Sequence, residues 1–179
     1  VAAGLGDWAT LAVVNWSASP RVFALPLAEA LAMHLRRIFG PGDWEADGLV
    51  AASFRHGTAA RLRLGETLTT RPVPAHGCEV IKLQPCRREA AMLVGTDGHF
   101  SMGGTEVRQW RCEGDRVEAV VWWPWPAPMA LTIGRCGADG SLRLQRLPVA
   151  DSAAEQRLCV DLGSPIPAAA DRQATPRAR

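Results

Sequence analysis

Three tryptophans stand close together in the segment WWPWP, residues 122–126, which is the most unusual local feature of the sequence. Flat indole faces stack on the apolar faces of pyranose rings, and such side chains supply much of the energy in binding patches. Successive residues of a strand point to opposite faces, so Trp122 and Trp123 cannot both point outward. Two interpretations stay open: Trp122, Trp123 and Trp125 bind carbohydrate, or they fill a core or an interface with another domain.

Acidic residues alternate at Asp43, Glu45 and Asp47, and alternating acids can ligate calcium. A calcium loop usually adds a bidentate acid and a turning glycine at defined spacing, and only Gly48 fits that pattern. A solvated loop is the simpler interpretation. A glycosidase site would need two carboxylates about 5–10 Å apart across a cleft, whereas these acids are expected in turns. We assign them no catalytic role.

The histidines, serines and cysteines do not show the spacing of a known site. His76, Cys78 and Cys86 have the pattern H-x-C-x7-C, which does not match the usual ligand spacings of zinc sites. Ser53 and Ser101 lack the Gly-x-Ser-x-Gly context of a nucleophile elbow. The sequence therefore leads us to assign no catalytic residue, no metal site and no cofactor.

Five cysteines are spread widely along the chain. An odd count without a Cys-x-x-Cys motif argues against a complete disulfide framework, and most free cysteines are buried small hydrophobes. We therefore expect reduced, structural cysteines rather than bridges. The five are Cys78, Cys86, Cys112, Cys136 and Cys159.

Length and composition describe a chain that can bury a real core. It has 179 residues, 47% of them hydrophobic, and a net charge of +2. This length suits one domain or two small ones. The small net charge does not indicate nucleic-acid binding. No apolar run approaches the ~18 residues that a membrane span needs. Arginine makes up nineteen of the twenty basic residues, and with the heavy use of alanine this is typical of a bacterial source. The first residue is Val1, so we expect a fragment or a processed product.

The N-terminal segments predict a hairpin. Residues 8–14 form a short apolar run, residues 21–27 alternate, and an Asn/Ser/Pro cluster lies between them. Two such runs around turn residues indicate an antiparallel hairpin. Asn15 and Ser17 also form a glycosylation acceptor, but nothing marks a eukaryotic secreted chain. We therefore favour a turn here, with Trp16 packed across the sheet.

The rest of the chain predicts one helix and many strands. Leucines and Ile38 recur at helical spacing over residues 27–39, which predicts one short amphipathic helix. After Gly48 the turns come roughly every eight to twelve residues, as in an all-β sandwich or barrel. The expected strands are 49–54, 60–64, 66–73, 78–83, 91–96, 104–112, 116–123, 129–135 and 141–147, with a further one at 157–162.

These elements predict an all-β protein, an antiparallel β-sandwich with one short helix. The polar joint at 86–89 divides it into two small stacked β subdomains. In this division residues 7–86 form a β-sandwich accessory domain, residues 87–149 a second antiparallel β subdomain, and residues 150–179 a weakly ordered C-terminal tail.

Three segments, in this order, are similar to those of a known family: AVVNWS at 12–17, VPAHGCEVIKL at 73–83 and MLVGTDGHF at 92–100. The first resembles a hydrophobic-Asn-Trp-Ser hairpin, the second a Pro-x-His-Gly/Ser segment before an apolar closing strand, and the third a Leu-x-Gly/Ser-Thr-x-x-His stretch. Together they resemble the C-terminal β-sandwich region of α-galactosidase-like (melibiase-type) glycoside hydrolases.

This resemblance implies a non-catalytic accessory domain. In such enzymes a (β/α)8 barrel performs the chemistry, and an all-β domain follows it. The chain would then pack against and stabilise a catalytic barrel N-terminal to Val1, in an enzyme acting on α-linked galactosides or related sugars. The two catalytic aspartates of the barrel have no counterpart here, so no catalytic residue is transferred.

Two alternatives stand beside this expectation: an independent carbohydrate-binding module that uses exposed tryptophans, and an interaction or assembly domain with no sugar role. The expected partners are the barrel and, through the tryptophans, carbohydrate, rather than nucleic acid or a membrane.

Overall fold

The computed structural model describes residues 4–42, 44–87, 90–150 and 152–163. Within these residues it has two helices, α1 (Glu29–Phe39) and α2 (Trp44–Asp47). The strands are β1 (Ala9–Val14), β2 (Ala24–Pro26), β3 (Leu49–Ser53), β4 (Ala59–Leu62), β5 (Thr67–Thr69), β6 (Cys78–Pro85), β7 (Ala91–Thr96), β8 (Val107–Glu113), β9 (Arg116–Trp123), β10 (Met129–Cys136), β11 (Leu142–Val149) and β12 (Ser152–Asp161). Neither helix is long and apolar enough to cross a membrane.

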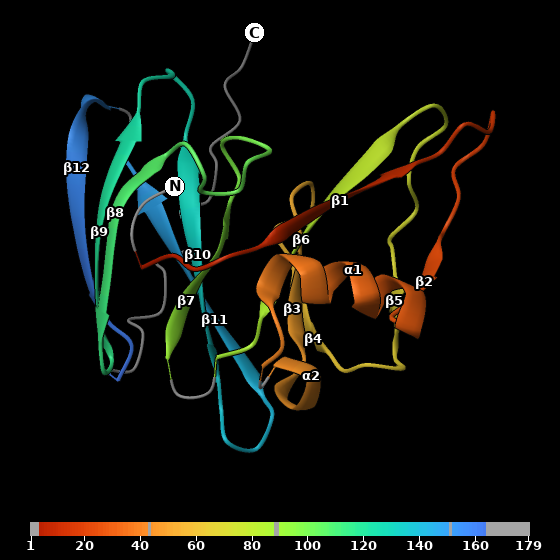
Figure 1. Cartoon of the computed structure of the whole chain (residues 1–179). Helices are drawn as coiled ribbons and strands as arrows, with labels where there is room; N and C mark the ends of the chain where they lie inside the picture. The colour runs from red at the N-terminus through yellow and green to blue at the C-terminus, as the bar shows by residue number, and fades with distance from the viewer. Residues whose placement is uncertain (1–3, 43, 88–89, 151, 164–179) are drawn as a thin grey trace, which may run out of the picture.

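Three sheets are stacked as layers (Figure 1). The N-terminal sheet has the order β1-β6-β3-β4, the central sheet β11-β10-β7 and the C-terminal sheet β12-β9-β8, and a two-stranded β2-β5 ribbon stands apart. Every strand pairing is antiparallel. The predicted all-β, antiparallel sandwich-type fold is therefore confirmed.

Strands β7 and β10 of the central sheet are buried on both faces. On one face Leu93 and Leu131 share a core cluster with Val121 of the C-terminal sheet. On the other face Val94 clusters with Val50 of the N-terminal sheet. Because successive strand residues point to opposite sides, a strand covered on both faces is apolar throughout. Strand β7 is buried along its whole length for this reason.

The helices cover the far side of the N-terminal sheet. Leu35 of α1 and Trp44 of α2 share a core cluster with Ile81 of β6. Helix α1 confirms the predicted segment, although Ile38, expected on its apolar face, is exposed. Sequence reasoning missed α2, a single turn held by the Trp44 indole, whose Nε1 donates to the Gly40 carbonyl at 2.9 Å.

The predicted N-terminal hairpin is wrong. Strand β1 pairs with β6, with Val14 opposite Cys78, and β2 pairs with β5. Both strands exist, but their partners lie more than forty residues farther along the chain, as in the register Ala24 to Thr69. Local apolar runs and turn residues indicate that strands form, and they do not encode these distant pairings.

Asn15 explains why the connection after β1 is a fixed loop. Its Nδ2 donates to the carbonyls of Ser19 and of residues 73 and 74, each at 2.9 Å, and its Oδ1 accepts from the backbone and hydroxyl of Ser17. The Asn15 amide is therefore buried and occupied, and it is no glycosylation acceptor in the folded chain. The expectation that Trp16 packs across the sheet is wrong, since this side chain is 82% exposed.

The expectation of reduced cysteines is wrong for Cys86 and Cys136 and holds for the other three. Cys86 and Cys136, fifty residues apart, form a disulfide between the N-terminal and central sheets. They are the two most buried of the five cysteines, whereas the free thiols of Cys78 and Cys159 are exposed and that of Cys112 is half-buried. A separation of this length carries no pattern that sequence reasoning can recognise.

The C-terminal segment is more ordered than predicted. Strand β12 pairs with almost the whole of β9, from Glu155 opposite Trp122 to Asp161 opposite Arg116. The strand expected at 157–162 is therefore present and begins earlier, so the predicted weakly ordered tail is wrong for residues 152–161. The rest of that prediction, residues 164–179, lies outside the described residues.

Candidate ligand-binding face

The structure places the three candidate tryptophans in different surroundings. Trp122 is 36% exposed on the outer face of the C-terminal sheet. Trp123 is 5% exposed in the core between the sheets, and its indole N–H donates to the Ala127 carbonyl at 2.7 Å. Trp125 is 61% exposed in the loop between β9 and β10. The alternation argument therefore holds for Trp122 and Trp123.

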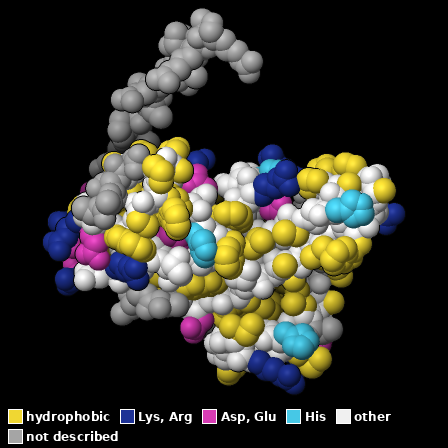
Figure 2. All heavy atoms as spheres, turned by 90° about the horizontal axis from the view of Figure 1, so that it is seen from above, with side chains coloured by type: hydrophobic (Ala, Val, Ile, Leu, Met, Phe, Trp, Pro, Cys, Tyr) yellow, Lys and Arg dark blue, Asp and Glu magenta, His cyan; other side chains and the backbone are white. Residues whose placement is uncertain are grey.

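Trp122 belongs to a mixed polar and apolar surface, which we call the outer face: the side of β8, β9 and β12 turned away from the central sheet. In the register of the sheet, Val120 lies between Gln109 of β8 and Arg157 of β12. Glu155 lies opposite Trp122. Figure 2 shows charged side chains gathered along this side of the molecule, at the left of the view, where Figure 1 places the three strands.

A bulge in β8 shapes one side of this face. The register with β9 shifts between Val107 and Gln109, so Arg108 and Gln109 are both exposed although they are consecutive. The Arg108 guanidinium lies over the Trp122 ring, 4.8 Å from its centroid. Bulges frequently redirect side chains in this way near functional sites. Sequence reasoning missed Arg108, since the shift depends on the pairing and not on the composition of β8.

A shallow depression of about 460 Å³ lies on the outer face. A smaller one of about 160 Å³ continues it along β8 and β9. The first is within the range of sites for small ligands, about 300–1,000 Å³. Its lining includes Arg108, Gln109, Arg111, Glu118, Val120 and Arg157.

The charges of the outer face are unevenly compensated. Arg111 pairs with Glu113 at 2.5 Å and Arg116 with Glu118 at 2.8 Å, and all four side chains are well exposed. Such exposed pairs contribute about 0–1 kcal/mol each, so a ligand can compete with them. Within the described ranges, Arg108 and Arg157 have no carboxylate at ion-pair distance. The face therefore offers two uncompensated guanidinium groups beside an indole.

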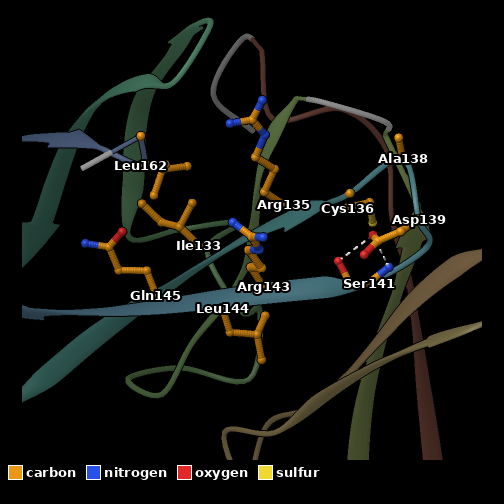
Figure 3. A pocket seen from close by; sticks show the side chains of 13 residues that line it. Ile133, Arg135, Cys136, Ala138, Asp139, Ser141, Arg143, Leu144, Gln145 and Leu162 are labelled. Carbon is orange, nitrogen blue, oxygen red and sulfur yellow. Dashed lines mark hydrogen bonds between the residues drawn. The ribbon is translucent and has the colours of Figure 1, made fainter. Parts of the chain in front are cut away.

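A larger depression of about 840 Å³ lies at the β10–β11 hairpin (Figure 3). Arg135 and Arg143 lie opposite each other across the two strands, but Arg135 is already paired with Asp115. Asp139 accepts from the hydroxyl and backbone of Ser141, and these bonds hold the pKa of its carboxyl below the ordinary value. Three of its polar side chains, those of Arg135, Asp139 and Ser141, are therefore already engaged within the chain.

Two buried ionisable groups lie away from any depression. Lys82 is 1% exposed, its Nζ donates to the Leu93 carbonyl at 2.8 Å, and it lies 4.5 Å from the centroid of the Trp8 ring. Burial lowers the pKa of Lys82 to about 7. Burial acts to raise the pKa of Glu106, but hydrogen bonds from Thr96 and neighbouring hydroxyls outweigh it and leave that pKa lowered. Neither group is open to a ligand.

A serine, a glutamate and a histidine do meet on the N-terminal sheet, in an order unlike that of a hydrolase. The Ser53 hydroxyl donates to one carboxylate oxygen of Glu79, and His56 Nε2 lies 3.6 Å from the other. In a serine hydrolase the imidazole contacts the nucleophile and the acid lies behind it. Here the carboxylate stands between the two, so the histidine cannot take the Ser53 proton directly.

The acids considered for calcium are not gathered. Glu45 is bound to Arg36, a hydrogen bond that lowers the pKa of its carboxyl. Asp47 is buried at the end of α2, and Asp43 lies outside the described residues. Among the residues that the structure describes, no three His, Cys, Asp or Glu side chains are placed to hold a metal ion.

No protein-family model, curated protein or solved structure matches this chain.

Proposed function

We propose that the chain is the non-catalytic C-terminal accessory β domain of an α-galactosidase-like glycoside hydrolase, packing against its catalytic barrel and stabilising it. The observation that carries this proposal is the exposed Trp16, which lies in the first segment that resembles the family. The Asn15 hydrogen bonds fix the loop on which Trp16 stands.

An exposed indole on a rigid loop is suited to a protein interface. Val14 and Val22, on either side of this loop, are also exposed. Tryptophan is enriched among the residues that dominate binding energy, and a loop ordered in advance loses little entropy on association. Figure 2 shows hydrophobic side chains spread over the surface of the N-terminal half. These features support docking of this end on a larger partner.

The buried acids support a structural role for the chain itself. Glu106 is buried and accepts hydrogen bonds from the hydroxyls of Thr96 and Ser101, and buried Glu79 accepts one from Ser53. A general acid or base must instead reach its substrate directly or through one water.

The test begins with the coding sequence upstream of Val1, which should encode a barrel. In the whole enzyme, Trp16→Ala should lower the melting temperature of the barrel and leave kcat nearly unchanged. Trp125→Ala is the matched control, because it removes another exposed indole, from the opposite half. Equal melting of wild type and Trp16→Ala would contradict the proposal, as would hydrolysis of a chromogenic α-galactoside by this chain alone.

A second candidate function is carbohydrate binding at the outer face, favoured by the Trp122–Arg108 stack. A pyranose ring can stack on indole, while the arginines, Gln109 and Glu155 offer donors and acceptors for hydroxyl groups. Affinity electrophoresis through galactomannan and other polysaccharides tests it. Retardation that Trp122→Ala removes and Trp125→Ala preserves would support this function, and no retardation on any polysaccharide would exclude it.

A further inference from the structure

Resting on the second candidate function, we infer that the outer face binds an anionic glycan, a sugar chain that carries uronate carboxylates or sulfate esters. The observation behind this inference is the excess of arginine in the depression on the outer face. Three arginines line the depression against one carboxylate, Glu118, which is itself paired with Arg116 outside it.

Arginine selects for an anion more than for a neutral sugar. A guanidinium has five N–H donors and no acceptor, whereas the hydroxyls of a neutral glycan both donate and accept. Its planar fork matches the oxygens of a carboxylate and other oxyanions bidentately. Since Arg108 and Arg157 have no carboxylate partner among the described residues, both forks are open to a ligand.

The positions of these groups fit a glycan lying across the strands. Arg108 lies over the Trp122 ring, 4.8 Å from its centroid, and has no carboxylate at ion-pair distance among the described residues. Arg157 is two strands away from Gln109, a span of roughly 10 Å at the usual strand spacing. A ring over Trp122 and Val120 would thus have cationic donors on both sides.

A glycan fits this face better than a nucleic acid does. Non-specific single-strand binding uses several aromatic platforms along a positive groove, and Trp122 is the one aromatic side chain exposed on the described part of this face. Glu155, opposite Trp122, can accept hydrogen bonds from sugar hydroxyls. The whole chain carries a net charge of only +2.

The test measures retardation of the whole chain in gels that contain polygalacturonate, a sulfated galactan, neutral galactomannan, poly-U or polyglutamate. We expect retardation by at least one of the first two, weakened as sodium chloride rises from 50 to 200 mM. Arg157→Gln and Trp122→Ala should each raise the apparent Kd about tenfold or more. Arg143→Gln, in the depression at the β10–β11 hairpin, should leave it unchanged.

The outcomes separate this inference from the function on which it rests. Binding to polygalacturonate alone assigns a uronate, and binding to the sulfated galactan alone assigns a sulfate ester. Equal binding to galactomannan overturns the anionic class and keeps glycan binding. Equal binding to poly-U or polyglutamate overturns the inference, since any polyanion would then suffice. Retardation in no gel overturns both the inference and the glycan-binding proposal.

Discussion

Two regions of the molecule contain charged side chains in opposite surroundings, one buried and one exposed to solvent. Lys82 and Glu106, near the contact of the N-terminal and central sheets, are almost fully enclosed and make several hydrogen bonds within the chain. Arg108 and Arg157, on the outer face, are exposed and uncompensated among the described residues. Charge alone therefore does not identify a binding residue; a charge whose hydrogen bonds are still open does.

The difference has an energetic basis. A buried polar group left without a partner costs about 1–3 kcal/mol, and more when it is charged. The inner region must therefore complete its own hydrogen bonds, and of the described buried side-chain atoms only Gln84 Nε2 lacks a partner. The outer face is under no such constraint, because water can satisfy its exposed donors. Matched substitutions in the two regions test this contrast.

Loss of the inner disulfide should have the largest effect. Replacing both Cys86 and Cys136 by serine releases a loop of fifty residues, and the chain-entropy relation gives about 4 kcal/mol of lost stability. Cys159→Ser on the outer face should change the free energy of unfolding by less than about 0.5 kcal/mol. Urea titration followed by fluorescence measures both. Equal midpoints for the two variants would contradict the contrast.

Glu106→Gln should have the next largest effect. It should lower the free energy of unfolding by about 3 kcal/mol, because it removes a buried carboxylate that accepts hydrogen bonds from the surrounding hydroxyls. Its counterpart Glu118→Gln removes one exposed ion pair and should cost at most about 1 kcal/mol. Thermal denaturation at pH 7 compares them. A larger loss for Glu118→Gln would reverse the assignment of the two regions.

Lys82 should make stability depend on pH. Its pKa is about 7 in the folded chain and 10.5 ordinarily, so between these values the unfolded chain binds more protons. Stability should therefore rise with pH from about 7 to about 10, at up to about 1.4 kcal/mol per unit, and stay level with respect to this group below pH 6. Lys82→Met should remove the rise, and Arg157→Met should keep it. Urea midpoints at pH 6, 8 and 9.5 measure this pH dependence. If the stability of Lys82→Met still rises with pH, another group is the cause.

Trp122→Ala should have the smallest effect on folding. It removes a half-exposed indole and one exposed cation–π contact, worth about 0.5–1 kcal/mol. Trp123→Ala, one residue away, should cost about 3–5 kcal/mol because it empties a core position. Calorimetric melting of the two variants measures both losses of stability. Similar losses for both would mean that Trp122 is a packing residue.

Local sequence patterns predicted the positions of strands, which depend on residues close together in the chain. The strand expected at 91–96 is β7 and that at 116–123 is β9, since alternation and flanking turns are local signals. The partner of β1, the Cys86–Cys136 bridge and the bulge at Arg108 all depend on residues brought from far along the chain. The tryptophans of the candidate site were therefore visible in the sequence, and the arginines around them were not.

The burial of β7 and β10 on both faces also decides how this chain can be cut or fused. Separate expression of the two predicted subdomains, residues 7–86 and 87–149, would expose Val50 and Val94 to water and leave Cys86 and Cys136 without each other. We expect neither half to express as a soluble protein, and the whole to unfold in one cooperative transition. Fusion partners and protease sites therefore belong before β1 or after β12, where the layers end.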